Sequence, residues 1–176
     1  MKKVTVLLLA LTLIAGLSFE SQAQKVQKSP RSVLTQTVGL TDISVTYARP
    51  GLKGREMATL APEGKVWRTG ANNATTVTIS NPITIGGKEL VAGTYALYTI
   101  PGASEWTIII NSKQSWGTQY DESSDVMRFT AKATKTVATT ETMTINISDI
   151  DANGKDANLE IAWGNVSVKA PFTVSQ

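Results

Sequence analysis

The chain of 176 residues contains no cysteine and no histidine. Without cysteine it forms no disulfide and offers no thiolate as a metal ligand or nucleophile. Without histidine it lacks the usual general base at neutral pH, the commonest metal ligand and the middle member of a hydrolytic triad. We therefore expect no zinc site, no thiol chemistry and no cofactor. An enzyme built from this sequence would have to use carboxylates, lysine, tyrosine or hydroxyl groups.

Charge is also scarce, because charged residues make up only 18% of the chain. Removing Lys2, Lys3 and Glu20 with the N-terminal segment takes the basic count from 17 to 15 and the acidic count from 14 to 13, so the net charge falls from +3 to +2. No run of lysine and arginine resembles a patch for nucleic acid or a membrane surface. We expect neither of these partners.

The first 23 residues have the three-part layout of a secretory signal peptide. Two lysines precede an apolar run from Val4 to Leu17, and the small residues Ser21 and Ala23 stand where signal peptidase reads the chain. The apolar run is about 14 residues long, too short to cross ~30 Å of hydrocarbon as a helix. We expect cleavage after Ala23, no stable membrane insertion, and export to the periplasm or the extracellular space.

The remaining residues, 24–176, predict a single all-β domain, since short segments rich in Thr, Val, Ile and Tyr alternate with Gly, Pro and Asn. The expected strands cover 41–49, 75–80, a hairpin over 83–91 that turns at Gly86 and Gly87, 93–100, 105–111, 126–132, 142–148, 158–163 and 166–174. Their spacing favours a two-layer antiparallel β-sandwich or jelly roll over a closed barrel. Residues 50–73 predict one long irregular loop with a single helical turn near Glu56 to Leu60, and such loops are often functional.

Arginine is concentrated in and beside this long loop, because four of the five arginines precede residue 70. Guanidinium groups bind carboxylates and phosphates bidentately, so their clustering predicts a pocket for an anionic or polar ligand. The candidate ligand-binding residues are Tyr47, Arg49, Arg55, Lys65, Trp67, Arg68 and Asn72, with Lys53 and Asn73 beside them. In the alternative interpretation, Arg49 and Arg68 tie the loop to the sheet through carbonyl and carboxylate groups.

Two of the four tryptophans, Trp67 and Trp116, stand beside loops and are candidate stacking platforms for a sugar, with a half-buried loop anchor as the alternative. Trp106 and Trp163 lie on apolar strand faces and are expected in the core. The acidic residues fall in two loops, Asp121, Glu122 and Asp125 in one and Asp149, Asp151 and Asp156 in the other. Both loops are typical of solvated turns, with calcium binding as the alternative for the second.

Several strings of residues are shared with one known family. These are Tyr-Ala-Arg-Pro-Gly-Leu-Lys-Gly-Arg at 47–55, Lys-Val-Trp-Arg-Thr-Gly-Ala-Asn at 65–72, Gly-Gly-Lys at 86–88, Ala-Gly-Thr-Tyr-Ala-Leu-Tyr-Thr-Ile-Pro at 92–101, Glu-Trp-Thr at 105–107, Trp-Gly at 116–117 and Tyr-Asp at 120–121. Together they resemble the bacterial family known as domain of unknown function 2911, from about Ser29 to the C-terminus. The resemblance implies an exported protein of a family with many members from Bacteroidetes-like bacteria and no assigned activity. Carried over to this chain, the family pattern points to Arg49, Pro50, Gly54, Arg55, Trp67, Arg68, Gly70, Ala71 and Asn72.

We interpret the mature domain as a non-enzymatic module that binds a small anionic or carbohydrate ligand, such as a glycan or another cell-envelope component. One alternative is a hydrolase-type enzyme in which Arg49, Arg55 and Arg68 stabilise an oxyanion. Its candidate carboxylates are Glu56, Glu63 and Asp121. A purely structural envelope protein is the other alternative. The sequence predicts no specific catalytic residue and no metal ligand, and it leaves the oligomeric state open.

Overall fold

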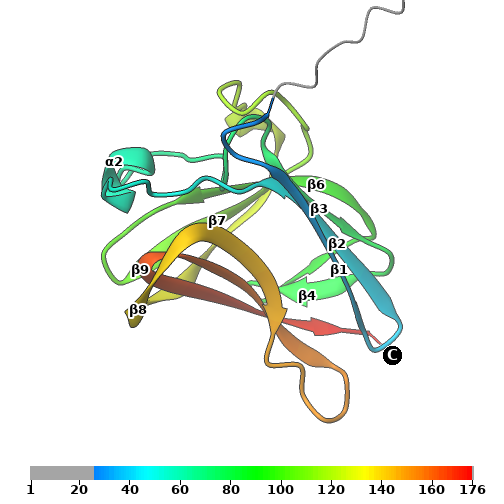
Figure 1. Cartoon of the computed structure of the whole chain (residues 1–176). Helices are drawn as coiled ribbons and strands as arrows, with labels where there is room; N and C mark the ends of the chain where they lie inside the picture. Colours follow the sequence, from blue (N-terminus) through cyan, green and yellow to red (C-terminus); the bar gives the residue numbers. More distant parts are fainter. Residues whose placement is uncertain (1–25, 176) are drawn as a thin grey trace, which may run out of the picture.

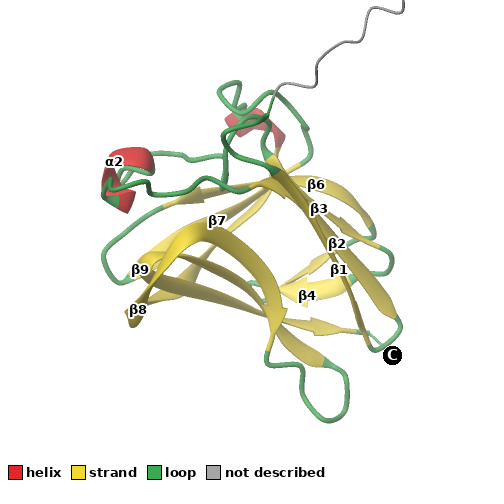
Figure 2. Ribbon diagram, viewed as in Figure 1, coloured by secondary structure: helices red, strands yellow, loops and turns green. Residues whose placement is uncertain are grey.

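The computed structural model describes residues 26–175, so the predicted signal peptide, residues 1–23, lies outside the described residues. The elements are β1 (Arg31–Val38), β2 (Thr41–Ala48), α2 (Met57–Leu60), β3 (Thr75–Ile79), β4 (Ile83–Ile85), β5 (Lys88–Leu90), β6 (Gly93–Ile100), β7 (Glu105–Asn111), the 3-10 turn η1 (Glu122–Ser124), β8 (Asp125–Ser148) and β9 (Asp156–Val174) (Figure 1). Figure 2 shows that strands dominate the described part of the chain. The predicted all-β class is confirmed.

All nine strands belong to one antiparallel sheet with the order β1-β2-β3-β6-β7-β8-β9-β4-β5. The sheet curls over itself, so that one face encloses a single core (Figure 1). Val45 of β2 and Ile108 of β7 are fully buried in this core together with Met143 of β8 and Ile161 of β9. The arrangement is therefore sandwich-like, as the strand spacing predicts. Within residues 26–175, no helix is long and apolar enough to cross a membrane.

Strand β6 is buried on both faces, as its continuous apolar sequence predicts. Tyr95 and Leu97 point into the main core, whereas Ala96 and Tyr98 belong to a smaller apolar cluster on the opposite face. The loop between β7 and β8 covers that opposite face, and its Tyr120 ring lies edge-on against Tyr98 with ring centroids 4.9 Å apart. This loop is therefore part of the folded structure and can hold a binding surface in place.

The two long strands β8 and β9 correct the predicted strand boundaries, because each joins two segments that the sequence predicts as separate strands. The pairing of β8 with β9 shifts register between Lys135 and Thr140 and again between Thr140 and Thr144. Gly164, with a φ of +60°, lies opposite Thr140 at this irregularity. A bulge lets a strand bend while it keeps its partner, so the breaks in the apolar pattern mark bends and not chain reversals.

Strand β1 is a further departure, because the sequence predicts no strand over 31–38. Its inward positions are Ser32, Leu34, Gln36 and Val38, of which only two are apolar, and the apolar Val33 points outward, so the alternation that marks a half-buried strand is broken. The predicted helical turn is present as α2, with Glu56 at its N-cap position. The long loop is fixed to the sheet at two points, since Gly51 pairs with Thr142 and Trp67 with Thr99 as isolated bridges.

Candidate functional site

An open groove of about 620 Å³ is lined by residues of the N-terminal segment and of the β7–β8 loop. Figure 1 shows that these two segments lie at the same end of the sheet. Its described lining residues are Val26, Gln27, Lys28, Arg31, Thr46, Tyr47, Ala48, Ala71, Asn72, Asn73, Ala74 and Trp116. They come from four places in the sequence: the segment that leads into β1, the end of β2, the end of the long loop, and the β7–β8 loop. The volume is in the range typical of small-molecule sites.

Backbone contacts hold the walls of the groove together. The amide N–H of Ala71 donates to the carbonyl of Ala48 at 3.3 Å, and Asn73 forms an isolated β-bridge with Trp116. Asn72 adopts a positive φ of 60°, a conformation that asparagine tolerates better than most residues. Its side-chain amide donates to the carbonyl of Ser29 at 3.5 Å, which links the long loop to the N-terminal segment.

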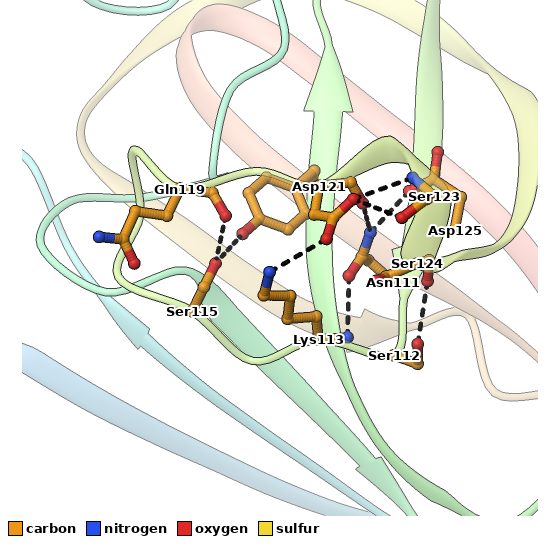
Figure 3. A network of polar contacts seen from close by, with 10 residues as sticks. Asn111, Ser112, Lys113, Ser115, Gln119, Asp121, Ser123, Ser124 and Asp125 are labelled. Atoms are coloured by element: carbon orange, nitrogen blue, oxygen red, sulfur yellow. Dashed lines mark hydrogen bonds and ion pairs between the residues drawn. The ribbon is translucent and has the colours of Figure 1, made fainter.

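Trp116 is the only tryptophan in the described lining of the groove, and 57% of its surface is exposed. The loop that carries it is held at both ends. Ser115 donates to the carbonyl of Gln119 at 2.8 Å and shares a hydrogen bond of 3.1 Å with the Tyr98 hydroxyl (Figure 3). An exposed indole on an anchored loop presents a flat apolar surface to solvent without the entropic cost of ordering a flexible chain.

A polar network supports the far end of the same loop (Figure 3). Asn111 is fully buried and donates to the Asp121 carbonyl and to Asp125 at 2.8 and 2.7 Å. The Asp121 carboxylate accepts from the Ser123 hydroxyl at 2.6 Å and pairs with Lys113 at 3.0 Å, and these contacts lower its pKa to about 2. Burial and a hydrogen bond to Asp125 raise the pKa of Tyr120 to about 12. The acidic loop is therefore a structural support.

The charge of the groove has one sign, since its described lining includes Lys28 and Arg31 and no aspartate or glutamate. Lys53 adds a further ammonium beside the N-terminal segment, because its Nζ donates to the Lys28 carbonyl at 3.5 Å. The other polar side chains in the lining include the amides of Gln27, Asn72 and Asn73 and the hydroxyls of Thr46 and Tyr47. Such a surface favours ligands that carry negative charge and hydroxyl groups.

Arg68 lies directly behind the groove wall. A Cβ atom added at Gly117 would overlap Arg68 Cδ and the Asn72 carbonyl oxygen, so Arg68 fills the space between these two segments. Its Nε is buried and has no hydrogen-bond partner within residues 26–175. The other four arginines all have partners: Arg31 with Thr46, Arg49 with Met143 and Thr144, Arg55 with Leu52 and Gly51, and Arg128 with Asp125 and Glu122. A buried donor left unpaired is uncommon in proteins.

Several of the sequence-predicted site residues form contacts inside the protein. Tyr47 is only 4% exposed, and its hydroxyl donates to the Ile145 carbonyl and accepts from the Ile145 amide. Arg49 donates to the Met143 carbonyl at 3.0 Å and to the Thr144 hydroxyl at 2.8 Å, which ties the start of the long loop to β8. Arg55 donates to two carbonyls of its own turn. The Arg49 contacts fit the alternative interpretation, in which Arg49 and Arg68 tie the loop to the sheet. The Arg55 contacts are local to its turn, and the Arg68 Nε makes no such contact within residues 26–175.

The structure thus divides the predicted cluster into separate places. Trp67 is 7% exposed and stacks on Trp163 in the core, so it is not available as a sugar platform. Lys65 is exposed and does not line the groove. Of the seven candidates, Asn72 and part of Tyr47 line the groove, and Arg68 lies behind it. Sequence reasoning missed Lys28 and Arg31, because neither belongs to a motif and the strand that positions Arg31 was not predicted.

The carboxylates do not gather into a metal site among the described residues. In the 149–156 loop, Asp149 pairs with Lys169 at 2.6 Å, and Asp151 accepts from the amides of Lys155 and Asp156. Asp156 accepts from Thr173. Each carboxylate therefore has its own partner: Asp149 and Asp156 contact side chains of β9, and Asp151 caps amides within the loop.

The structure thus combines an all-β scaffold with an open surface groove. A family model described as protein of unknown function (DUF2911) matches residues 29–172. The chain therefore belongs to the DUF2911 family, as its motifs indicate. No curated protein and no solved structure matches the chain.

Proposed function

We propose that this protein is an exported, non-enzymatic binding module whose groove takes an anionic carbohydrate, such as an acidic glycan of the cell envelope. The observation that carries the proposal is the composition of the groove. An exposed indole, Trp116, stands opposite cationic and amide side chains, and the described lining holds no carboxylate.

Each part of such a ligand has a partner of matching chemistry. The face of a sugar ring is apolar and stacks on an indole, so Trp116 is the platform. Hydroxyl groups both donate and accept, and the amides of Asn72 and Asn73 can do the same. A carboxylate, sulfate or phosphate substituent would be attracted to Lys28 and to the guanidinium of Arg68.

Binding accounts for the arrangement better than hydrolysis does. A general acid that works near neutral pH needs a raised pKa, whereas the pKa of Asp121 is lowered to about 2 by Ser123 and Lys113. Glu56 and Glu63 are exposed and do not line the groove. The carboxylates that an arginine-assisted hydrolase would need therefore lie elsewhere.

The first experiment is isothermal titration of the full-length chain, expressed with its own leader, against three probes. These are a uronic-acid oligosaccharide, the neutral oligosaccharide of the same length, and inorganic phosphate. We expect the acidic oligosaccharide to bind at least tenfold more tightly than either of the others. If the neutral oligosaccharide binds as tightly as the acidic one, the groove does not select for negative charge. If only phosphate binds, the groove is a simple anion site and not a carbohydrate site. Either result, or no binding of any probe, would overturn the proposal.

Variants of the chain locate the site. We expect Trp116→Ala and Arg68→Ala each to weaken binding of the acidic oligosaccharide at least tenfold. Lys65→Ala is the matched control, because it removes an exposed cation of the long loop that does not line the groove. If all three variants bind alike, the ligand does not occupy this groove.

Export is tested separately, by mass spectrometry of the protein recovered from the periplasm and the medium. Cleavage after Ala23 leaves Gln24 as the first residue. Recovery of the intact N-terminus from the cytoplasm alone would contradict the proposed location and would leave the groove chemistry to be judged on the titrations.

A further inference from the structure

Strand β1 forms one edge of the sheet, and no strand in the described part of the chain pairs with its outer side. It pairs with β2 without a register shift from Arg31 opposite Ala48 to Val38 opposite Thr41. The Arg49 amide donates to the Pro30 carbonyl, so residue 30 and the even-numbered residues after it face β2. The backbone groups of Arg31, Val33, Thr35 and Thr37 therefore point away from the sheet.

The two edges of the sheet differ in how well they are protected against pairing with another chain. At the opposite edge, β5 has only three residues and carries Lys88 and Glu89. Strand β1 has eight residues, with no lysine, proline or bulge between Arg31 and Val38. Its outward side chain Val33 is 52% exposed. Short length, charge, proline and bulges are the usual devices that block an edge, and β1 has none of them except the charge of Arg31 at its first position.

Two exposed charges lie at opposite ends of this edge. Arg31 stands at its start and donates to Thr46 at 3.4 Å, and Asp42 lies opposite Thr37 near its end and accepts from the Thr37 hydroxyl at 2.6 Å. Neither Arg31 nor Asp42 forms an ion pair within residues 26–175. Antiparallel pairing of two identical strands places the start of one beside the end of the other, so these two charges are complementary between copies.

We propose that β1 pairs antiparallel with β1 of a second copy of this chain, about a two-fold axis at Leu34. In this register Val33 lies opposite Thr35 of the second copy, and Arg31 lies opposite Thr37 of the second copy. All four outward-facing residues then exchange backbone hydrogen bonds with the other strand. The partly buried side chains of Leu34 from the two copies meet at the axis, where they extend the core.

The same register brings the charges together. Cα atoms are about 5.5 Å apart in a hydrogen-bonded antiparallel pair and about 4.5 Å in a non-hydrogen-bonded one, which places the Cα of Arg31 about 10 Å from that of Asp42 in the second copy. Opposite residues in an antiparallel pair lie on the same face of the sheet, so the arginine side chain can span this distance to the carboxylate. Two symmetric ion pairs therefore flank the paired strands.

The pairing shares one residue with the groove, because Arg31 is the one residue of β1 in the described lining. Pairing draws its guanidinium toward Asp42 of the second copy, while Lys28 and Arg68 remain for an anionic ligand. Sedimentation without any ligand tests the dimer, and titration of the Trp116 and Arg68 variants, which leave β1 unchanged, tests the groove. The two proposals can therefore be judged separately.

Sedimentation equilibrium of the full-length chain over a concentration series tests the proposal. We expect a weight-average mass that rises with concentration toward twice that of the monomer. Arg31→Asp and Asp42→Arg should each weaken the dimer about tenfold, since each replaces two ion pairs by like-charge contacts, and the double variant should restore association. A mass that stays monomeric at every concentration would overturn the proposal, as would single variants that associate like the wild type.

Thr35→Pro tests the backbone pairing itself. It removes an N–H that points to solvent in the monomer, and edge strands tolerate proline at such positions. We expect loss of the dimer with an unchanged circular dichroism spectrum. Lys88→Glu on the short edge is the control and should leave the mass distribution as in the wild type. A dimer that survives Thr35→Pro, or one that is lost with Lys88→Glu, would place the interface elsewhere.

Discussion

Trp67 stacks on Trp163 with ring centroids 5.4 Å apart and an angle of 16° between the ring planes. The same Trp67 ring meets Trp106 edge-on at 6.1 Å, and its indole N–H donates to the Gly70 carbonyl. Three of the four tryptophans therefore form one cluster beneath the long loop. The fourth, Trp116, is exposed and lines the groove. This separation explains why the loop can be irregular and still hold a fixed position on the sheet.

The tryptophan cluster is expected to contribute much of the stability of the long loop. Trp67→Ala removes two aromatic contacts and leaves a cavity in the core, so it should lower the free energy of unfolding by about 3–5 kcal/mol. Trp116→Ala is the control, because its side chain is mostly exposed, and it should change stability by less than about 0.5 kcal/mol. Urea unfolding followed by far-ultraviolet circular dichroism measures both. Similar losses for the two variants would contradict this division of roles.

Arg49 and Arg55 offer a second matched pair. Arg49 bonds to β8, far away in the sequence, whereas Arg55 bonds only within its own turn. Arg49→Ala leaves the Met143 carbonyl without its side-chain donor and should cost about 1–3 kcal/mol. Arg55→Ala should cost less than about 0.5 kcal/mol. Thermal unfolding of the two variants distinguishes hydrogen bonds between distant segments from those within one turn. Equal unfolding midpoints for Arg49→Ala and Arg55→Ala would contradict the proposed role of Arg49.

Gly117 is expected to tolerate no side chain. A Cβ at this position would overlap Arg68 Cδ and the Asn72 carbonyl oxygen, and one of these contacts involves backbone that cannot rotate away. Gly117→Ala should therefore destabilise the protein by about 1–3 kcal/mol. Gly51→Ala is a suitable control, because the nearest atom to its added Cβ is a flexible Glu141 oxygen at 3.4 Å. Chemical unfolding measures the free energy of unfolding of both variants. Equal values would contradict the prediction and would show that the β7–β8 loop shifts to make room for the added methyl group.

We expect acid to weaken the contacts that hold the Trp116 loop in place. Hydrogen bonds from Ser123 and the nearby Lys113 lower the pKa of Asp121 to about 2 in the folded chain, against an ordinary value of 3.8. A lowered pKa stabilises the fold above the ordinary value, and this contribution is lost as the pH falls through about 2. A carboxyl titration by NMR should show a midpoint near 2 for Asp121. In a Lys113→Ala variant, whose ion pair is gone, the midpoint should move upward, and an unchanged midpoint would remove Lys113 as a cause.

Part of this structure was predictable from the sequence alone. Strands β6 and β7 have the predicted bounds, and the hairpin β4–β5 turns at Gly86 and Gly87 with positive φ at both glycines. These features follow from local chemistry: alternation along a strand, and the freedom of glycine in a primed turn. At the bends in β8 and β9, however, the sequence predicts that one strand ends and another begins, because a bulge and a turn interrupt the apolar pattern in the same way.

The groove was not predictable in the same sense. Because arginine is scarce, its clustering predicts a site at Arg49, Arg55 and Arg68. Whether a guanidinium faces carbonyls or solvent, however, depends on what packs around it. Lys28 and Trp116 come together with Asn72 only because β1, the long loop and the β7–β8 loop end at the same place on the sheet.

The sequence by itself determined the all-β class, most strand positions and the family, since these depend on residue patterns that act over short distances. Tertiary structure decided that Trp67 belongs to the core while Trp116 lines a groove. It also decided that Arg49 bonds to β8 while the Arg68 Nε has no hydrogen-bond partner among residues 26–175, and that β1 is an edge strand in this part of the chain. Burial and hydrogen-bond partners are set by segments far apart in the chain, and no local pattern records them.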